Sequence, residues 1–121
     1  MNDFTQKVQE CIEVAIRMFS LPISVDDVKI SYYEKGLDAG FAEMRTVNGK
    51  RIYSIRFNQY HIDHFESIMI EQIIPHEVAH IVCFFDPSTM SKHNYKWVLV
   101  CYMLGGNGSR THDMPAIRAR A

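Results

Sequence analysis

Residues 76–80 read His76-Glu77-Val78-Ala79-His80, a match to the pattern HExxH. With the histidine and glutamate content of this chain, about 0.02 accidental matches are expected. On a helix, residues four positions apart lie on one face, so His76 and His80 can present two ring nitrogens to one metal ion. Glu77 is offset around the helix, where it can reach a water molecule on that ion.

The residues around the motif predict that its helix is buried. They are apolar, namely Ile73, Ile74, Val78, Ala79, Ile81 and Val82. The alternative is a surface helix whose two histidines are solvated. In a buried helix, unpaired histidines and an unpaired glutamate would cost free energy. We therefore favour a metal-binding helix.

Composition narrows the classes of protein further. A chain of 121 residues, 47% hydrophobic and 22% charged, forms one domain, which we assign to residues 1–121. A net charge of −1 argues against a chain-wide polyanion binder. We expect no membrane span and no secretory signal. Three scattered cysteines without a CxxC pair favour a reducing compartment, so we expect a cytoplasmic or nucleoid-associated protein.

The first half of the chain predicts one helix and three strands. Apolar residues at helical spacing span about residues 3–19. Strand-like alternation follows at about 28–32, 39–46 and 51–57, and Asn48-Gly49 favours a hairpin between the last two. We expect a three-stranded, mostly antiparallel sheet.

The second half predicts the motif helix and a C-terminal helix. The motif helix should span about residues 63–84, with Asp63 as its cap, and Pro75 should either kink it or begin a new helix. A further helix over about 93–104 should stop at Gly105-Gly106. The fold class is therefore α+β.

Two residues compete to be a third metal ligand. Asp86 stands six residues after His80, where a related motif places a ligand after a glycine turn, but Cys83 occupies the glycine position. Without that turn the helix continues and directs Asp86 away from the metal. His93 opens the next helix, which can return over the motif. We favour His93.

Six stretches of the chain, in this order, are more specific than HExxH alone. They are Ala39 to Ala42, Ile55 to Asn58, Ile73 to His80, His93 to Trp97, Leu104-Gly105 and Ser109 to His112. Together they resemble the SprT-like metalloprotease domain, found in bacterial SprT proteins and in the eukaryotic Spartan protease. The resemblance covers about residues 28–113.

The resemblance implies a compact zincin-like fold with Zn²⁺ on His76, His80 and His93 and with Glu77 as the catalytic base. It also implies proteolysis, with protein or peptide substrates, and in Spartan-like members cleavage of DNA-bound and DNA-crosslinked proteins, with single-stranded DNA as a candidate partner. Two departures are visible. Asn94 stands where members often have glycine, and the four-cysteine zinc ribbon typical of bacterial members is absent from these 121 residues.

The expected mechanism also needs a group that stabilises the oxyanion of the tetrahedral intermediate. Tyr95, Arg110 and His112 are the candidates, although Tyr95 is equally suited to the core, and Arg110 and His112 to helix capping or to solvent. Trp97 is expected to pack against the motif helix.

Two further functions compete with a protease acting at DNA. One is a zinc-bound scaffold that binds DNA or protein without significant hydrolysis, and the other is a hydrolase of small amides or nucleotides. A basic cluster at Arg45, Lys50, Arg51 and Arg56 is the candidate DNA contact, but acidic neighbours favour a mixed solvated face.

Overall fold

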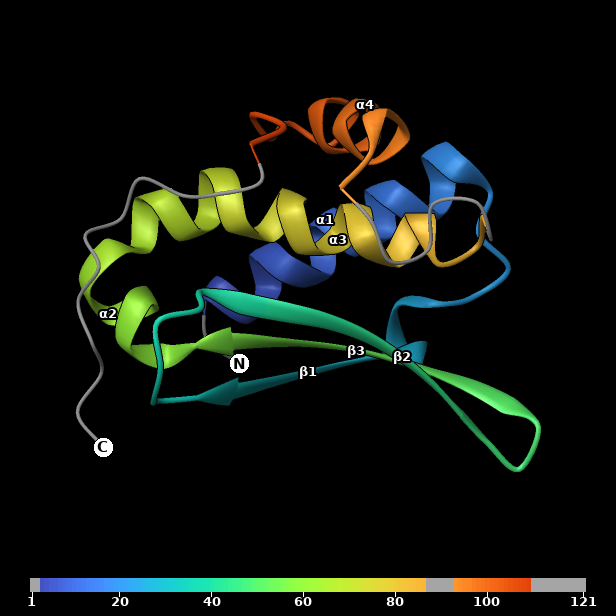
Figure 1. Ribbon diagram of the computed structural model, residues 1–121, viewed down its shortest axis with the longest axis horizontal. Helices are drawn as coiled ribbons and strands as arrows, with labels where there is room; N and C mark the ends of the chain where they lie inside the picture. Colours follow the sequence, from blue (N-terminus) through green and yellow to red (C-terminus); the bar gives the residue numbers. More distant parts are fainter. Residues whose placement is uncertain (1–2, 87–92, 110–121) are drawn as a thin grey trace.

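The computed structural model describes residues 3–86 and 93–109 and shows an α+β fold in layers. Figure 1 shows a three-stranded sheet below, α1 and α3 across one face of it, and α4 on top of α3. The elements are α1 (Asp3–Phe19), β1 (Val28–Tyr33), β2 (Gly40–Val47), β3 (Lys50–Asn58), α2 (Gln59–Ile68), α3 (Ile74–Cys83) and α4 (Tyr95–Met103). The fold class and the N-terminal helix are as predicted.

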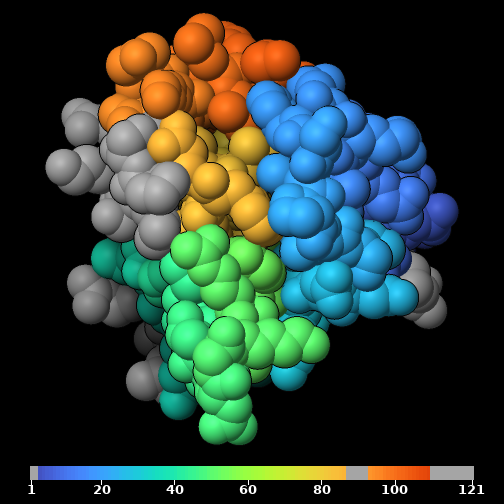
Figure 2. All heavy atoms as spheres, turned by 90° about the vertical axis from the view of Figure 1, so that its right-hand side faces the viewer, coloured from blue at the N-terminus to red at the C-terminus, as the bar shows by residue number. Residues whose placement is uncertain are grey.

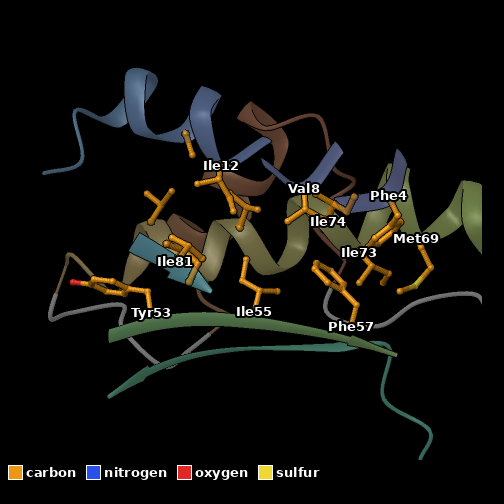
Figure 3. Close-up of a cluster of buried hydrophobic side chains, with 14 of the residues drawn as sticks. Phe4, Val8, Ile12, Tyr53, Ile55, Phe57, Met69, Ile73, Ile74 and Ile81 are labelled. Atoms are coloured by element: carbon orange, nitrogen blue, oxygen red, sulfur yellow. The ribbon is translucent and has the colours of Figure 1, made fainter. Parts of the chain in front are cut away.

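The core lies between the helices and one face of the sheet (Figure 3). On α1, side chains at helical spacing point into it, and on β3 alternate side chains do so, because a strand directs every second residue to the same face. The buried members that these two elements supply are Phe4, Val8, Ile12, Ala15, Tyr53, Ile55 and Phe57. Helix α3 completes this core with Ile74, Val78 and Ile81.

The sheet is mixed, and the prediction of a mostly antiparallel sheet is wrong. The strand order is β1-β3-β2, with β1 parallel to β3 and β2 antiparallel to β3. The expectation fails because strands adjacent in sequence do not all pair: residues 34–39 carry the chain past the end of β3 before β2 begins. The hairpin between β2 and β3 does form, with positive φ at Asn48 and Gly49.

Asn58 holds this crossover in place. Its side chain is fully buried, and its Nδ2 donates hydrogen bonds to the carbonyls of Gly36 (3.2 Å) and Asp38 (3.1 Å). Its Oδ1 accepts from the backbone N–H of Tyr60 at 2.9 Å, which caps the N-terminus of α2. One side chain therefore joins the end of β3, the crossover and the next helix.

The segment before the motif differs from the predicted helix over 63–84. Helix α2 begins at Gln59 with Asn58 as its cap, so the assignment of Asp63 as the cap is wrong. A π-helical turn, Met69–Ile73, then leads into α3. Pro75 lies in the first turn of α3. Proline lacks an N–H and clashes with the carbonyl four residues earlier, and the wider π turn accommodates both effects.

The C-terminal helix agrees with prediction to within two residues. It ends at Met103, and Gly105 follows with a φ of +93°. Viewed end-on, α4 lies uppermost, the end of α3 lies below it, and the β2–β3 hairpin lies below both (Figure 2).

Within residues 3–86 and 93–109, no helix combines the length and the apolar character needed to cross a membrane.

We predict that Asn58→Ala lowers the free energy of unfolding by about 2–3 kcal/mol, because it removes a helix cap and leaves two carbonyls of the crossover without their donor. Urea denaturation measures the change. Gln59→Ala, at the neighbouring half-buried position, is the control and should cost much less. A loss below 0.5 kcal/mol for Asn58→Ala, about the size of an ordinary surface substitution, would contradict this role.

Candidate metal centre

Three histidine rings meet on the face of α3 that is turned toward α4. The Nε2 atom of His93 lies 2.9 Å from Nε2 of His80 and 3.3 Å from Nε2 of His76. Nitrogens bound to a tetrahedral zinc ion at about 2.0–2.1 Å are roughly 3.3 Å apart. The three rings therefore have the donor type and spacing that such an ion requires. Within the described residues, they are the one group of three or more potential ligands close enough to hold a metal.

The protonation of the cluster also suits a metal. Burial, and after it the neighbouring His76 and His93, lower the pKa of His80 to about 3. His80 is therefore neutral at physiological pH, with a lone pair available for coordination. Three imidazoles this close together cannot all carry a proton without strong repulsion.

The start of α4 places the third histidine. Asn94 is the N-cap of α4, and its Oδ1 accepts a hydrogen bond from the backbone N–H of Trp97 at 3.2 Å. The departure of Asn94 from the family's glycine therefore has a structural reason. His93 directly precedes this cap, so fixing the first turn of α4 also fixes His93 over α3.

Trp97 forms the floor of the cluster and is completely buried, as predicted. Its ring centre lies 4.7 Å from that of His76, 5.4 Å from that of His80 and 4.6 Å from that of His93. Its Nε1–H donates to the backbone carbonyl of His76 at 3.2 Å. One side chain of α4 thus contacts all three histidines and ties α4 to the first turn of α3.

Asp86, the competing candidate for third ligand, lies outside the cluster. Its Oδ2 forms an ion pair with Nζ of Lys96 at 3.1 Å. The pair connects the end of α3 to the first turn of α4, one turn beyond His93. Asp86 therefore contributes to the connection between the two helices.

Glu77 is buried beside the cluster, with its Oε2 atom 3.7 Å from Nε2 of His76. Burial, and after it the nearby Asp38 carboxylate, raise the pKa of Glu77 to about 8. Gly40, the first residue of β2, lies directly against it: a Cβ atom at Gly40 would be 3.4 Å from Cγ of Glu77 and 3.0 Å from the carbonyl oxygen of Arg56.

Of the three oxyanion candidates, Tyr95 alone falls within the described residues. Tyr95 lies in the first turn of α4 with 70% of its surface exposed, so the alternative of a core residue is wrong. Arg110 and His112 lie outside the described residues. Sequence analysis missed Tyr33, Asp38 and Gly40 as neighbours of Glu77. No local pattern marks them, because the β1–β2 crossover brings them to α3.

Comparison with known proteins agrees with this geometry. A profile of the SprT-like family matches residues 8–116. The chain belongs to the SprT-like family. The match includes α3, His93 and α4, so the three-histidine cluster lies inside the shared region.

Curated relatives of this SprT-like chain carry the name Protein SprT. The protein from Yersinia enterocolitica is 24% identical over 119 residues, covering 96% of this chain and 66% of the relative. The protein from Serratia proteamaculans is 26% identical over 111 residues, covering 89% of this chain and 62% of the relative. The chain thus spans slightly less than two thirds of the length of these relatives. A comparison with solved structures found no significant match to this chain.

We predict that His93→Ala lowers the affinity for Zn²⁺ by more than about 100-fold, because one of three nitrogen donors is lost. Asp86→Ala is the matched comparison and should retain tight binding, since Asp86 contacts Lys96 and not the cluster. Competition with a chromogenic chelator measures both affinities. Tight binding by the His93 variant with loss in the Asp86 variant would reverse the assignment.

We also predict that Co²⁺ quenches the fluorescence of this chain stoichiometrically. Trp97 is the single tryptophan, and it contacts all three histidines, so a paramagnetic ion on them lies close to the indole. A fluorescence titration measures the quenching, and His93→Ala should abolish it at the same Co²⁺ concentrations. Unchanged fluorescence with one Co²⁺ bound per chain would show that the ion lies elsewhere.

Proposed function

We propose that this chain is a zinc-dependent endopeptidase with a zincin-like arrangement, acting on DNA-associated or DNA-crosslinked proteins. The observation that carries the proposal is the convergence of His76, His80 and His93 beside the buried carboxyl of Glu77, in a chain of the SprT-like family. Three histidine donors leave one position of a tetrahedral ion for water or substrate, which is the composition of a catalytic zinc site.

Each residue of the site then has a chemical role. His76, His80 and His93 hold the zinc ion, which when bound acidifies water and polarises the scissile carbonyl. Glu77 accepts the proton of the attacking water and returns it to the leaving amine. A raised pKa makes the Glu77 carboxylate a stronger base than an exposed carboxylate, which favours the first of these steps, the removal of a proton from water.

The unpaired edge of β2, within the described residues, is an argument for a peptide substrate. The N–H of Asn58 donates to the carbonyl of Ala39 at 2.9 Å, so Ala39 bonds toward β3. Bonding alternates along an antiparallel strand, so Gly40 and Ala42 direct their backbone N–H and C=O groups away from β3. Within the described residues, β2 pairs with β3 alone. An extended peptide can therefore add to this edge next to Glu77.

Support for DNA as a partner is more limited and comes chiefly from the resemblance to Spartan. Arg45 and Lys50 are exposed on the projecting β2–β3 hairpin. Two other basic residues of the cluster are engaged: Arg56 pairs with Glu43 at 3.0 Å, and Nη1 of Arg51 donates to the carbonyl of Phe84 at 3.3 Å. A DNA contact at the hairpin would therefore rest on few charges.

We predict that Glu77→Gln retains zinc but loses cleavage by at least about 100-fold, because the amide cannot accept the proton from water. The assay is cleavage of a DNA-binding protein by the zinc-loaded chain, with and without single-stranded DNA, followed on gels. Cleavage that depends on Glu77 and rises with DNA supports both parts of the proposal. Equal cleavage without DNA removes the DNA part, and undiminished cleavage by Glu77→Gln would overturn the mechanism. Bound zinc without cleavage in either condition would favour the scaffold function.

A further inference from the structure

We propose that a cleft on the outer face of the sheet, beside Gly40, binds a lysine or arginine side chain of the peptide held at the edge of β2. This inference rests on the proposed peptidase function and specifies which substrates that function selects. The cleft has a volume of about 460 Å³ and is lined by Tyr33, Glu34, Lys35, Asp38, Phe41 and Arg56.

Two aromatic rings supply an apolar wall of the cleft. The ring centres of Tyr33 and Phe41 are 5.5 Å apart with 33° between their planes, and Phe41 is 39% exposed. Their positions follow from the register: Phe41 is paired with Arg56, while the neighbouring Phe57 points to the core. Side chains alternate between the two faces of a sheet, so Phe41 and Arg56 lie on the face turned away from the helices.

The charges around the cleft favour a cation. Arg56 is already neutralised by Glu43 at 3.0 Å and lies over the Phe41 ring, 5.8 Å from its centre. The remaining charged lining groups are the carboxylates of Glu34 and Asp38 and the single ammonium of Lys35. Aromatic faces combined with a surplus of carboxylate attract ammonium and guanidinium groups. The same negative environment raises the pKa of Tyr33, after the larger effect of burial.

The cleft is located where it can receive the side chain of one particular residue of a bound peptide. A peptide residue directly opposite Gly40 directs its side chain to the same face of the sheet as Gly40. This is the face on which Glu77 lies. The next residue, opposite Phe41, directs its side chain to the outer face. A long lysine or arginine side chain can reach from there over Phe41 into the cleft. The basic residue should therefore lie at a constant, short distance in sequence from the cleaved bond.

The test uses peptides of twelve residues built from glycine, alanine, serine and glutamine, with one arginine moved through successive positions. Matched peptides carry citrulline, which has the shape of arginine but no charge. Affinities are measured with the zinc-loaded Glu77→Gln chain, so that binding is read without cleavage. The zinc-loaded chain with Glu77 intact is then given the same peptides, and the cleaved bond is located by mass spectrometry.

We expect the arginine peptide to bind at least 5-fold more tightly than the citrulline peptide, and the cleaved bond to move with the arginine. Asp38→Asn in the Glu77→Gln chain should bring the two affinities within 2-fold of each other. Glu13→Gln, which removes an exposed carboxylate of α1, is the matched control and should leave the ratio unchanged.

Equal affinities for arginine and citrulline peptides, or a cleaved bond that stays in place when arginine moves, would overturn the cleft assignment. The cleft assignment would also be overturned if Asp38→Asn and Phe41→Ser, each tested in the Glu77→Gln chain, left the ratio of arginine-peptide to citrulline-peptide affinity unchanged. Tighter binding of arginine peptides without cleavage of any peptide would support the cleft and contradict the peptidase function. The two proposals therefore fail in different ways.

Discussion

Helix α3 has apolar side chains on two faces, and the packing of both faces determines where the polar groups lie. Ile74, Val78 and Ile81 enter the core formed with α1 and the sheet. Ala79 and Cys83 pack against α4 through Trp97 and Cys101. His76, Glu77 and His80 occupy the sector between these faces. A helix buried in this way excludes water from its polar side chains, which explains both the low pKa of His80 and the high pKa of Glu77.

The third histidine depends on contacts between α3 and α4 that are distant in sequence from the motif. The place of His93 follows from the cap by Asn94 and from the hydrogen bond of Trp97 to the carbonyl of His76. Of these, Trp97 acts on the ligands most directly, because its ring packs against all three imidazoles. The cluster is thus assembled by the packing of α4 on α3 as well as by the motif itself.

Local patterns in the sequence predicted local features well. The spacing of apolar residues in α1 and the Asn48-Gly49 hairpin rest on interactions within one or two elements. The position of His93 near the motif was expected because it opens the helix that follows the turn after α3. The mostly antiparallel pairing and the start of the helix before the motif were predicted wrongly, and both depend on Asn58, whose side chain bonds to a crossover some twenty residues earlier. The same crossover brings Asp38 and Tyr33 near Glu77. Residues placed by a long-range connection of this kind leave no periodic signal.

Gly40 shows how the sheet and α3 constrain each other. Its φ is not in the left-handed region, so conformational freedom does not explain the glycine. Lack of space explains the glycine, because a Cβ atom would lie 3.0 Å from the carbonyl oxygen of Arg56 and 3.4 Å from Cγ of Glu77. The absence of a side chain lets the edge strand pass directly against Glu77. In the proposed peptidase, a peptide paired with this edge would place its own backbone, rather than a side chain, nearest to Glu77.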